Sequence, residues 1–243
     1  MDDPTAILRR VNETYSQCRS YSDSGFAVLD DVQQNKERIE FRTLFVRPDY
    51  FCFEWQDYGP RRGKSERFST VWSNGEKTIV RHDTGQIKIE NMSSLNLAIA
   101  GATGCSAAAA YIVPALLLPQ LRGPKHLFML SDLELISQDT VGEDVCYILR
   151  GSLLKKADHI LWISKNDFSL RRLTSDYSRT AEELERAMQE ITKNVELMAK
   201  LAENGIVPPS EVKHEALRLV TEYFYSEVSF DEPIVPAPEP VAL

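Results

Sequence analysis

The chain lacks the residue patterns that mark most catalytic, metal and nucleotide sites. It contains no G-x-S-x-G turn, no Walker A loop and no G-x-G-x-x-G fingerprint. Its four histidines are scattered. His214-Glu215 begins like the zinc motif H-E-x-x-H, but Arg218 stands where the second histidine is required. We therefore expect a protein that is not an enzyme and that needs neither a metal nor a cofactor.

Positive charge is also scarce. The 28 lysines and arginines are outnumbered by 36 acidic residues, which gives a formal net charge of −8 and a pI near 5.2. Nucleic acids and anionic membrane surfaces both select clustered Lys and Arg. The composition therefore argues against either as the main partner.

Cysteine is sparse and dispersed. The four residues (Cys18, Cys52, Cys105 and Cys146) form no C-x-x-C pair and no Cys/His pair at zinc spacing. Four separate small buried side chains are one interpretation. One or two disulfides in an oxidising compartment are the other.

A secretory signal is missing from the first residues, MDDPTAILRR, which have no basic segment followed by an apolar one. Two interpretations follow: a cytosolic protein, or one whose natural start lies upstream of Met1.

Only one long apolar run occurs, at residues 95–118. A transmembrane helix needs about 20 apolar residues, so the length fits. However, polar, glycine and proline residues interrupt this run, namely Asn96, Gly101, Thr103, Gly104, Ser106 and Pro114. We predict no transmembrane segment but two short helices, broken near Gly101–Gly104 and again at Pro114.

The most informative stretch is IEFRTLFVRPDYFCFEW, from Ile39 to Trp55. Large apolar side chains alternate with polar ones on both sides of Arg47-Pro48-Asp49, which predicts two β-strands and a turn. Phe41 and Phe45 share a face in the first strand, as do Phe51, Phe53 and Trp55 in the second. The pair therefore presents a wall of aromatic rings, which covers either a solid core or an apolar ligand.

Strand patterns occupy most of the remaining chain. Asp3 and Pro4 predict the start of a helix that reaches about residue 19. A strand over Tyr21–Asp31, broken at Ser24-Gly25, follows. Further strands are predicted at 68–72, 77–82, 87–90, 133–138, 145–150, 159–164, 169–176 and 224–230. Within them, Ile160-Leu161-Trp162-Ile163 is apolar on both faces, which predicts that something covers the second face.

A helical hairpin is predicted over residues 178–217. Thr180 and Glu183 form a capping-box pattern, and apolar residues then recur every three or four positions to about Asn204. A second, shorter helix is expected around Val212–Leu219. The apolar stripe of 180–204 either packs on the sheet or forms a docking face or dimer seam; we favour a monomer. The tail at 231–243 is proline-rich and is expected to be extended and loosely held.

The order of these segments resembles the bacterial outer-membrane lipoprotein-sorting (LolA/LolB-like) superfamily, and within it the uncharacterised periplasmic branch. The resemblance lies in FRTLFVRPDYFCFEW, VWSNGEKTIV, ATGCSAAAAYIVPALLLP and CYILRG…HILWISKNDFSLRRL. It covers roughly residues 5–177 and 218–235. The hairpin at 178–217 and the missing signal peptide depart from the family pattern.

The resemblance implies a single α+β domain over 1–243, in which helices fill the concave side of a strongly curved, unclosed antiparallel barrel. It implies a periplasmic, non-enzymatic carrier that holds lipid or lipoprotein acyl chains between sheet and helices. It also implies that Arg47, at the Arg-Pro junction, holds the lid helices by hydrogen bonds. The alternative function is a protein-interaction or envelope-sensor module without lipid, bound to an envelope protein.

The candidate ligand-binding residues are large apolar side chains of the predicted wall and helices, together with Arg47. They are Phe41, Phe45, Arg47, Phe51, Phe53, Trp55, Ile99, Ile112, Leu116, Leu117 and Trp162. For each apolar member the plain alternative is an ordinary core position.

Overall fold

One antiparallel sheet organises the molecule. The computed structural model describes residues 2–31, 36–57, 67–83, 86–123, 126–154, 157–186 and 217–240. Its strands are β1 (Ser20–Asp31), β2 (Lys36–Val46), β3 (Tyr50–Asp57), β4 (Arg67–Ser73), β5 (Thr78–Asp83), β6 (Ile87–Met92), β7 (Ser131–Val141), β8 (Asp144–Leu153), β9 (Ala157–Ser164), β10 (Leu170–Arg179) and β11 (Leu217–Phe230).

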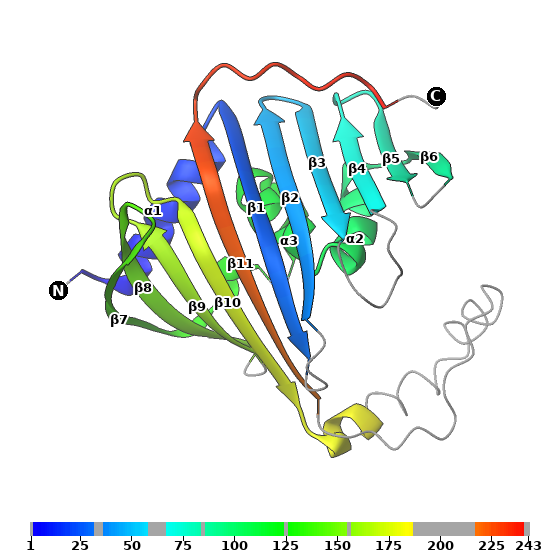
Figure 1. Cartoon of the computed structure of the whole chain (residues 1–243). Helices are drawn as coiled ribbons and strands as arrows, with labels where there is room; N and C mark the ends of the chain where they lie inside the picture. Colours follow the sequence, from blue (N-terminus) through cyan, green and yellow to red (C-terminus); the bar gives the residue numbers. More distant parts are fainter. Residues whose placement is uncertain are drawn as a thin grey trace.

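The strand order is β6-β5-β4-β3-β2-β1-β11-β10-β9-β8-β7, and every neighbouring pair is antiparallel. Two runs of consecutive strands thus meet where β1 pairs with β11. Because β6 and β7 are the two ends of this order, the sheet stays open. The helices lie on one face, behind the sheet in Figure 1. The predicted fold class, an unclosed antiparallel sheet with helices on one side, is confirmed.

The aromatic hairpin forms as its alternation predicts. In β2 and β3, Phe41 lies opposite Trp55, and Phe45 lies opposite Phe51. These rings and Phe53 are at most 5% exposed and belong to the main core. The intervening side chains face the other way, which makes this hairpin one wall of the interior.

Three α-helices and two short 3-10 helices cover that wall: α1 (Pro4–Gln17), α2 (Leu95–Cys105), α3 (Ala109–Leu117), η2 (Pro119–Leu121) and η3 (Leu127–Met129). Asp3 caps α1 as predicted, because its Oδ1 accepts a hydrogen bond from the Thr5 N–H at 3.0 Å. Tyr15, fully buried in α1, accepts a bond from the Leu170 N–H at 3.0 Å. That contact ties α1 to β10.

The apolar run at 95–118 does form two short helices, but both predicted break points are wrong. Gly101 lies inside α2 and Pro114 lies inside α3. The chain turns instead at Ala107 and Ala108, which adopt left-handed φ angles of 49° and 68°. Burial of almost all of α3 outweighs the cost of its proline. Within the described ranges, every helix is too short or too polar to span a bilayer.

The strand that is apolar on both faces, β9, is covered on its outer side by a cation. Its residues Leu161 and Ile163 are buried in the main core, whereas Trp162 points to the opposite face. There the Arg172 guanidinium lies 4.4 Å from the Trp162 ring centroid and pairs with Glu222 at 2.6 Å. The prediction that Trp162 faces the interior is therefore wrong. Neither a lid nor a ligand is needed to explain the second apolar face.

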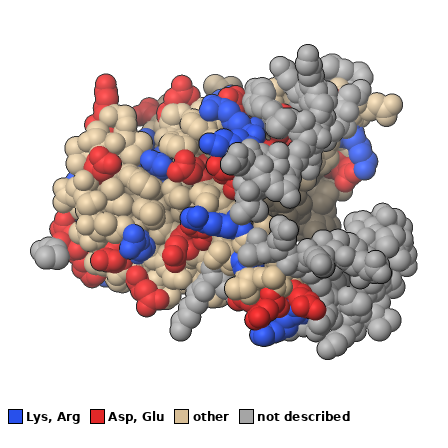
Figure 2. Space-filling view, turned by 60° about the horizontal axis from the view of Figure 1, so that its bottom comes forward, with Lys and Arg blue, Asp and Glu red and all other residues tan. Residues whose placement is uncertain are grey.

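Ion pairs spread charge of both signs over the outer surface. Examples are Arg38 with Glu40 at 3.1 Å and Arg218 with Asp176 at 2.6 Å. In the view of Figure 2, blue and red side chains lie beside one another over the described surface. The excess of acidic residues therefore does not gather into one broad patch on this side.

Only the edges of the predicted hairpin at 178–217 belong to the described residues. Ser178 and Arg179 end β10, Leu217 begins β11, and residues 181–186 are helical. The capping box is confirmed, because Thr180 and Glu183 exchange side-chain and backbone hydrogen bonds at 3.1 and 3.2 Å. The second helix, predicted around Val212–Leu219, is wrong for residues 217–219, because they belong to β11. The rest of the hairpin lies outside the described residues, and with it the question whether the apolar stripe packs on the sheet or forms a docking face or dimer seam.

The tail after Phe230 is held along the upper end of the sheet in Figure 1, from β11 towards β5. The Trp72 indole donates to the Ala237 carbonyl at 3.1 Å, and the Ala237 N–H donates to the Tyr50 hydroxyl at 2.7 Å. Ile234 and Ala237 cover a second apolar cluster on the outer face, formed by Leu44, Cys52, Trp72 and Ile79. The expectation of a loosely held tail is wrong for residues 231–239.

All four cysteines are free, and Cys105 alone among them is exposed. The interpretation as separate thiols is thus the one that the structure supports.

A buried carboxyl in β1 predicts an unusual pH dependence of stability. Asp23 is 2% exposed and accepts hydrogen bonds from the Tyr21 hydroxyl (2.7 Å) and the Thr43 N–H (2.8 Å). Burial outweighs these bonds and raises the pKa of Asp23 from 3.8 to about 6. The folded state therefore binds this proton more tightly than the unfolded state. We expect its contribution of about 3 kcal/mol, present below pH 4, to be lost as the pH rises through 6.

Urea unfolding between pH 3.5 and 7 tests this expectation by comparing wild type with Asp23→Asn. Because asparagine cannot ionise, the variant should gain relative stability as the pH rises. Asp158→Asn, an exposed position on β9, serves as the control and should leave the profile unchanged. A constant difference between wild type and Asp23→Asn across this range would contradict the assignment.

Candidate functional site

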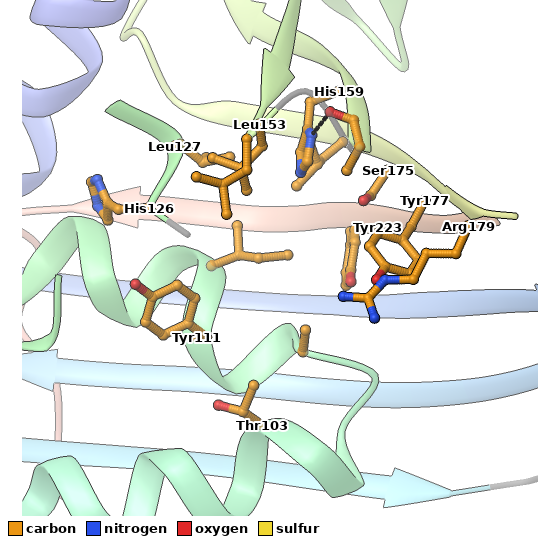
Figure 3. Close-up of a pocket in the computed structure, with 15 residues that line it drawn as sticks. Thr103, Tyr111, His126, Leu127, Leu153, His159, Ser175, Tyr177, Arg179 and Tyr223 are labelled. Atoms are coloured by element: carbon orange, nitrogen blue, oxygen red, sulfur yellow. Dashed lines mark hydrogen bonds between the residues drawn. The ribbon is translucent and has the colours of Figure 1, made fainter. Parts of the chain in front are cut away.

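An enclosed apolar space lies beside the aromatic wall, over the other half of the sheet. It has a volume of about 280 Å³ and is bounded by the β8–β11 half of the sheet on one side and by helical segments on the other (Figure 3). We call it the β8–β11 cavity. Its sheet side comprises Leu153, Leu154, Ala157, His159, Leu173, Ser175, Tyr177, Arg179 and Tyr223; its helix side comprises Thr103, Ala108, Tyr111, Ile112, His126 and Leu127.

Strand alternation explains the sheet side of the cavity. In β10, Leu173, Ser175, Tyr177 and Arg179 are two residues apart and therefore point to the same face. The apolar residues of the cavity lining lie toward β8 and the helices, whereas Ser175, Tyr177 and Arg179 lie at the end of β10 (Figure 3). The cavity thus has an apolar interior and a polar end.

Two histidines line the cavity in their neutral form. The His126 Nδ1 accepts a hydrogen bond from the Phe128 N–H at 3.2 Å, so its Nε2 carries the proton and donates to the Ala115 carbonyl at 3.0 Å. Burial, together with the nearby Arg122 charge, lowers the pKa of His126 to about 4. Burial also lowers the pKa of His159. At neutral pH these rings contribute polarity without charge.

Specific hydrogen bonds hold the helix side against the sheet. The Tyr223 hydroxyl donates to the Ala107 carbonyl at 2.6 Å, at the turn between α2 and α3. The Tyr111 hydroxyl accepts from the Gly123 N–H at 2.8 Å. These bonds fix the turn and the chain after α3, so the cavity wall is built by backbone as well as by side chains.

The Arg47 side chain links the ends of helices α1 and α3 to the sheet. Its guanidinium donates to the carbonyls of Ser16 (2.7 Å), Cys18 (2.7 Å) and Leu117 (3.0 Å), with a longer bond to Tyr15. These carbonyls end α1 and α3, where helices leave acceptors unpaired and carry partial negative charge. One side chain thus anchors the ends of two helices, as the resemblance implies for Arg47.

The candidate ligand-binding residues fall into different places. Phe45, Phe51, Phe53, Leu116 and Leu117 are almost completely buried in the main core, as are Phe41, Trp55 and Ile99 at 2–5% exposure. Ile112 alone among the predicted set lines the β8–β11 cavity. Trp162 lies on the outer face. The aromatic wall is therefore packed mainly against protein. Phe45 and Phe51 also border one smaller hollow and Phe41 and Trp55 another, but none of these four rings lines the β8–β11 cavity.

The residues that do line the cavity were missed for an identifiable reason. Ile160-Leu161-Trp162-Ile163 shows no preferred face, so the four residues alone do not assign the inner one. Asp158, however, shares a face with Ile160 and Trp162, and an unpaired aspartate belongs to the solvent side. This alternation places Ala157, His159 and Leu161 on the inner face. It would have identified Ala157 and His159 as residues that line the cavity.

The described part of the chain holds no group of three His, Cys, Asp or Glu side chains able to bind a metal ion.

Comparisons with known proteins bear on the fold. No protein-family model and no curated protein matches the chain. The structure is similar to that of LprF from Mycobacterium bovis, with 8% sequence identity, a TM-score of 0.50 and coverage of 98% of this chain and 97% of LprF. Other similar structures are a LolA superfamily protein from Nitrosomonas europaea (10% identity, TM-score 0.32, 96% of each chain) and MucA/MucB from Pseudomonas aeruginosa (13%, 0.41, 72% of this chain and 51% of that chain).

The similarity to LprF extends over nearly the whole of both chains. At this level of identity it shows a shared fold and nothing further. The fold that the sequence predicts, an open antiparallel sheet with helices on one face, is therefore shared with LprF.

Proposed function

We propose that this protein is a non-enzymatic binding protein or carrier of the bacterial cell envelope, which encloses an acyl chain in the β8–β11 cavity. The observation that carries the proposal is the cavity itself, with its mainly apolar lining and volume of about 280 Å³. Ligand pockets commonly measure about 300–1,000 Å³, so this one suits a single chain better than several. The periplasmic location implied by the resemblance is part of the proposal.

The energetics favour an apolar guest. Each buried methylene group contributes about 0.8 kcal/mol, so even a medium-length chain gains several kcal/mol on entry. Arg47 and Tyr223 support this proposal, because they hold the helix side in place by hydrogen bonds while the cavity remains open. A preformed site loses less free energy to ordering when the ligand binds.

Filling the cavity with protein should abolish binding. Ser175→Phe places a ring in the cavity, whereas Ser178→Phe places the same ring on the exposed outer face of β10. We expect the Kd of 11-(dansylamino)undecanoic acid, measured by fluorescence, to rise at least tenfold in Ser175→Phe and to stay within twofold in Ser178→Phe.

Two results would refute the carrier function. One is wild-type protein, purified without detergent, that shows no lipid by native mass spectrometry and does not bind the dansyl probe. The other is a folded Ser175→Phe variant that binds the probe as tightly as wild type. The alternative of a protein-interaction or sensor module rests on the helix expected at 180–204, most of which lies outside the described residues, and it stays a prediction.

A further inference from the structure

The polar end of the β8–β11 cavity contains a single full positive charge, that of Arg179. Among the lining residues described above there is no aspartate or glutamate, and both histidines are neutral. Arg179 is the last residue of β10 and pairs with Leu217 of β11, two residues beyond Tyr177, whose partner on β9 is Ala157. It therefore stands at the mouth of the cavity.

Arg179 differs from the other described arginines whose Nε is buried and unbonded in having no carboxylate partner among the described residues. In the described part of the chain, four arginines have a buried Nε without a hydrogen-bond partner: Arg81, Arg171, Arg172 and Arg179. The first three form ion pairs, with Asp83, with Asp144 and Asp167, and with Glu222. No ion pair of Arg179 is present among the described residues. A buried donor without an acceptor is rare in folded proteins and requires an explanation.

The surroundings of Arg179 hold the guanidinium inward. Its carbon atom Cζ lies 5.3 Å from the centroid of the Tyr177 ring, and Figure 3 shows the group reaching back toward Tyr223 inside the cavity. Two acidic side chains close to it in sequence are engaged elsewhere: Asp176 pairs with Arg218 on the outer face, and Glu183 accepts from the Thr180 N–H. The protein thus leaves this cation available to something that enters the cavity.

We infer that the ligand of the β8–β11 cavity is an anionic amphiphile, with its acyl chain among Leu153, Leu173 and Ile112 and its carboxylate or phosphate against Arg179. This inference rests on the proposed function and adds the chemistry of the head group. Arginine presents its N–H donors in a planar fork that matches carboxylate and phosphate oxygens, and such charge-assisted bonds are stronger than neutral ones. Ser175 and Tyr177 add hydroxyl groups at the same end.

The test compares charged and neutral probes that have the same chain. Wild type should bind 11-(dansylamino)undecanoic acid at least tenfold more tightly than its methyl ester. Arg179→Gln should lose that preference by weakening the acid and leaving the ester unchanged, whereas Arg179→Lys should retain most of it. Displacement of the ester probe by oleic acid, by oleoyl lysophosphatidic acid and by neutral monoolein then distinguishes a carboxylate from a phosphate head group.

The outcomes distinguish a failure of the head-group inference from a failure of the proposed carrier function. If wild type binds acid and ester equally, or if Arg179→Gln keeps the full preference for the acid, the head-group inference is wrong while the carrier function stands. If wild type binds neither probe, the proposed function itself fails. Circular dichroism of each variant shows whether a loss of binding reflects the site or the fold.

Discussion

Arg47→Ala is expected to lower the free energy of unfolding by about 2–4 kcal/mol and to loosen both helices that it holds. The substitution removes every hydrogen bond from this guanidinium to the ends of α1 and α3. The Cys18 and Leu117 carbonyls would then be left without this charged donor in a half-buried place. Urea unfolding measures the stability, and hydrogen exchange of the amides in α3 measures the loosening.

Two control variants make this experiment specific. Arg42→Ala removes an exposed arginine from the outer face of β2, the strand that Arg47 follows, and should change stability by less than about 0.5 kcal/mol. Arg47→Lys keeps the charge but loses the planar fork, so it should recover only part of the stability. If Arg47→Ala were as stable as Arg42→Ala, with unchanged exchange in α3, Arg47 would not be the link between the helices and the sheet.

Gly25→Ala is expected to destabilise the protein by about 3 kcal/mol or more. A Cβ atom at Gly25 would lie 2.3 Å from the carbonyl oxygen of Phe224 and 2.6 Å from the Phe41 ring. The first of these atoms belongs to the backbone of β11, which is paired with β1 at this point. The clash can be relieved only if strands β1 and β11 shift relative to each other.

Gly101→Ala is the matched control for Gly25→Ala. Gly101 lies in α2 with no atom within 4 Å of an added Cβ, so alanine should stabilise the protein by roughly 0.5–1 kcal/mol through helix propensity. Thermal unfolding monitored by circular dichroism compares the two variants. A Tm for Gly25→Ala equal to that of wild type would show that the two strands can separate at little cost.

Local patterns predicted the strands and the first helix well, because these signals depend on residues close in sequence. The alternation in Phe41–Trp55 and the Asp3 cap of α1 are both of this kind. The predicted break of the first strand at Ser24-Gly25 was wrong, because the role of Gly25 depends on residues that are far from it in sequence. Gly25 is needed for the close approach of Phe41 and Phe224, residues that only the folded sheet brings near.

The site was harder to predict than the fold, because aromatic content does not distinguish a packed wall from an open one. Phe45, Phe51 and Phe53 are at most 1% exposed and belong to the same core cluster as the buried residues of α2 and α3. The cavity forms where Leu173, Ser175 and Tyr223 meet the turn after α2. That meeting depends on the turn at Ala107 and Ala108, and no residue pattern marks two alanines as a turn.

The pairing of β1 with β11 also determines the order in which the protein can be assembled on the ribosome. Strands β2 to β6 and strands β7 to β10 are each neighbours along the chain and need no distant partner. The strand that joins these two halves is synthesised after both, so until then β1 and β10 each present an unpaired edge. Such edges invite pairing with other chains, and closing a contact between the two ends of a chain is slow. A nascent protein of this design therefore depends most on chaperones just before its last strand emerges.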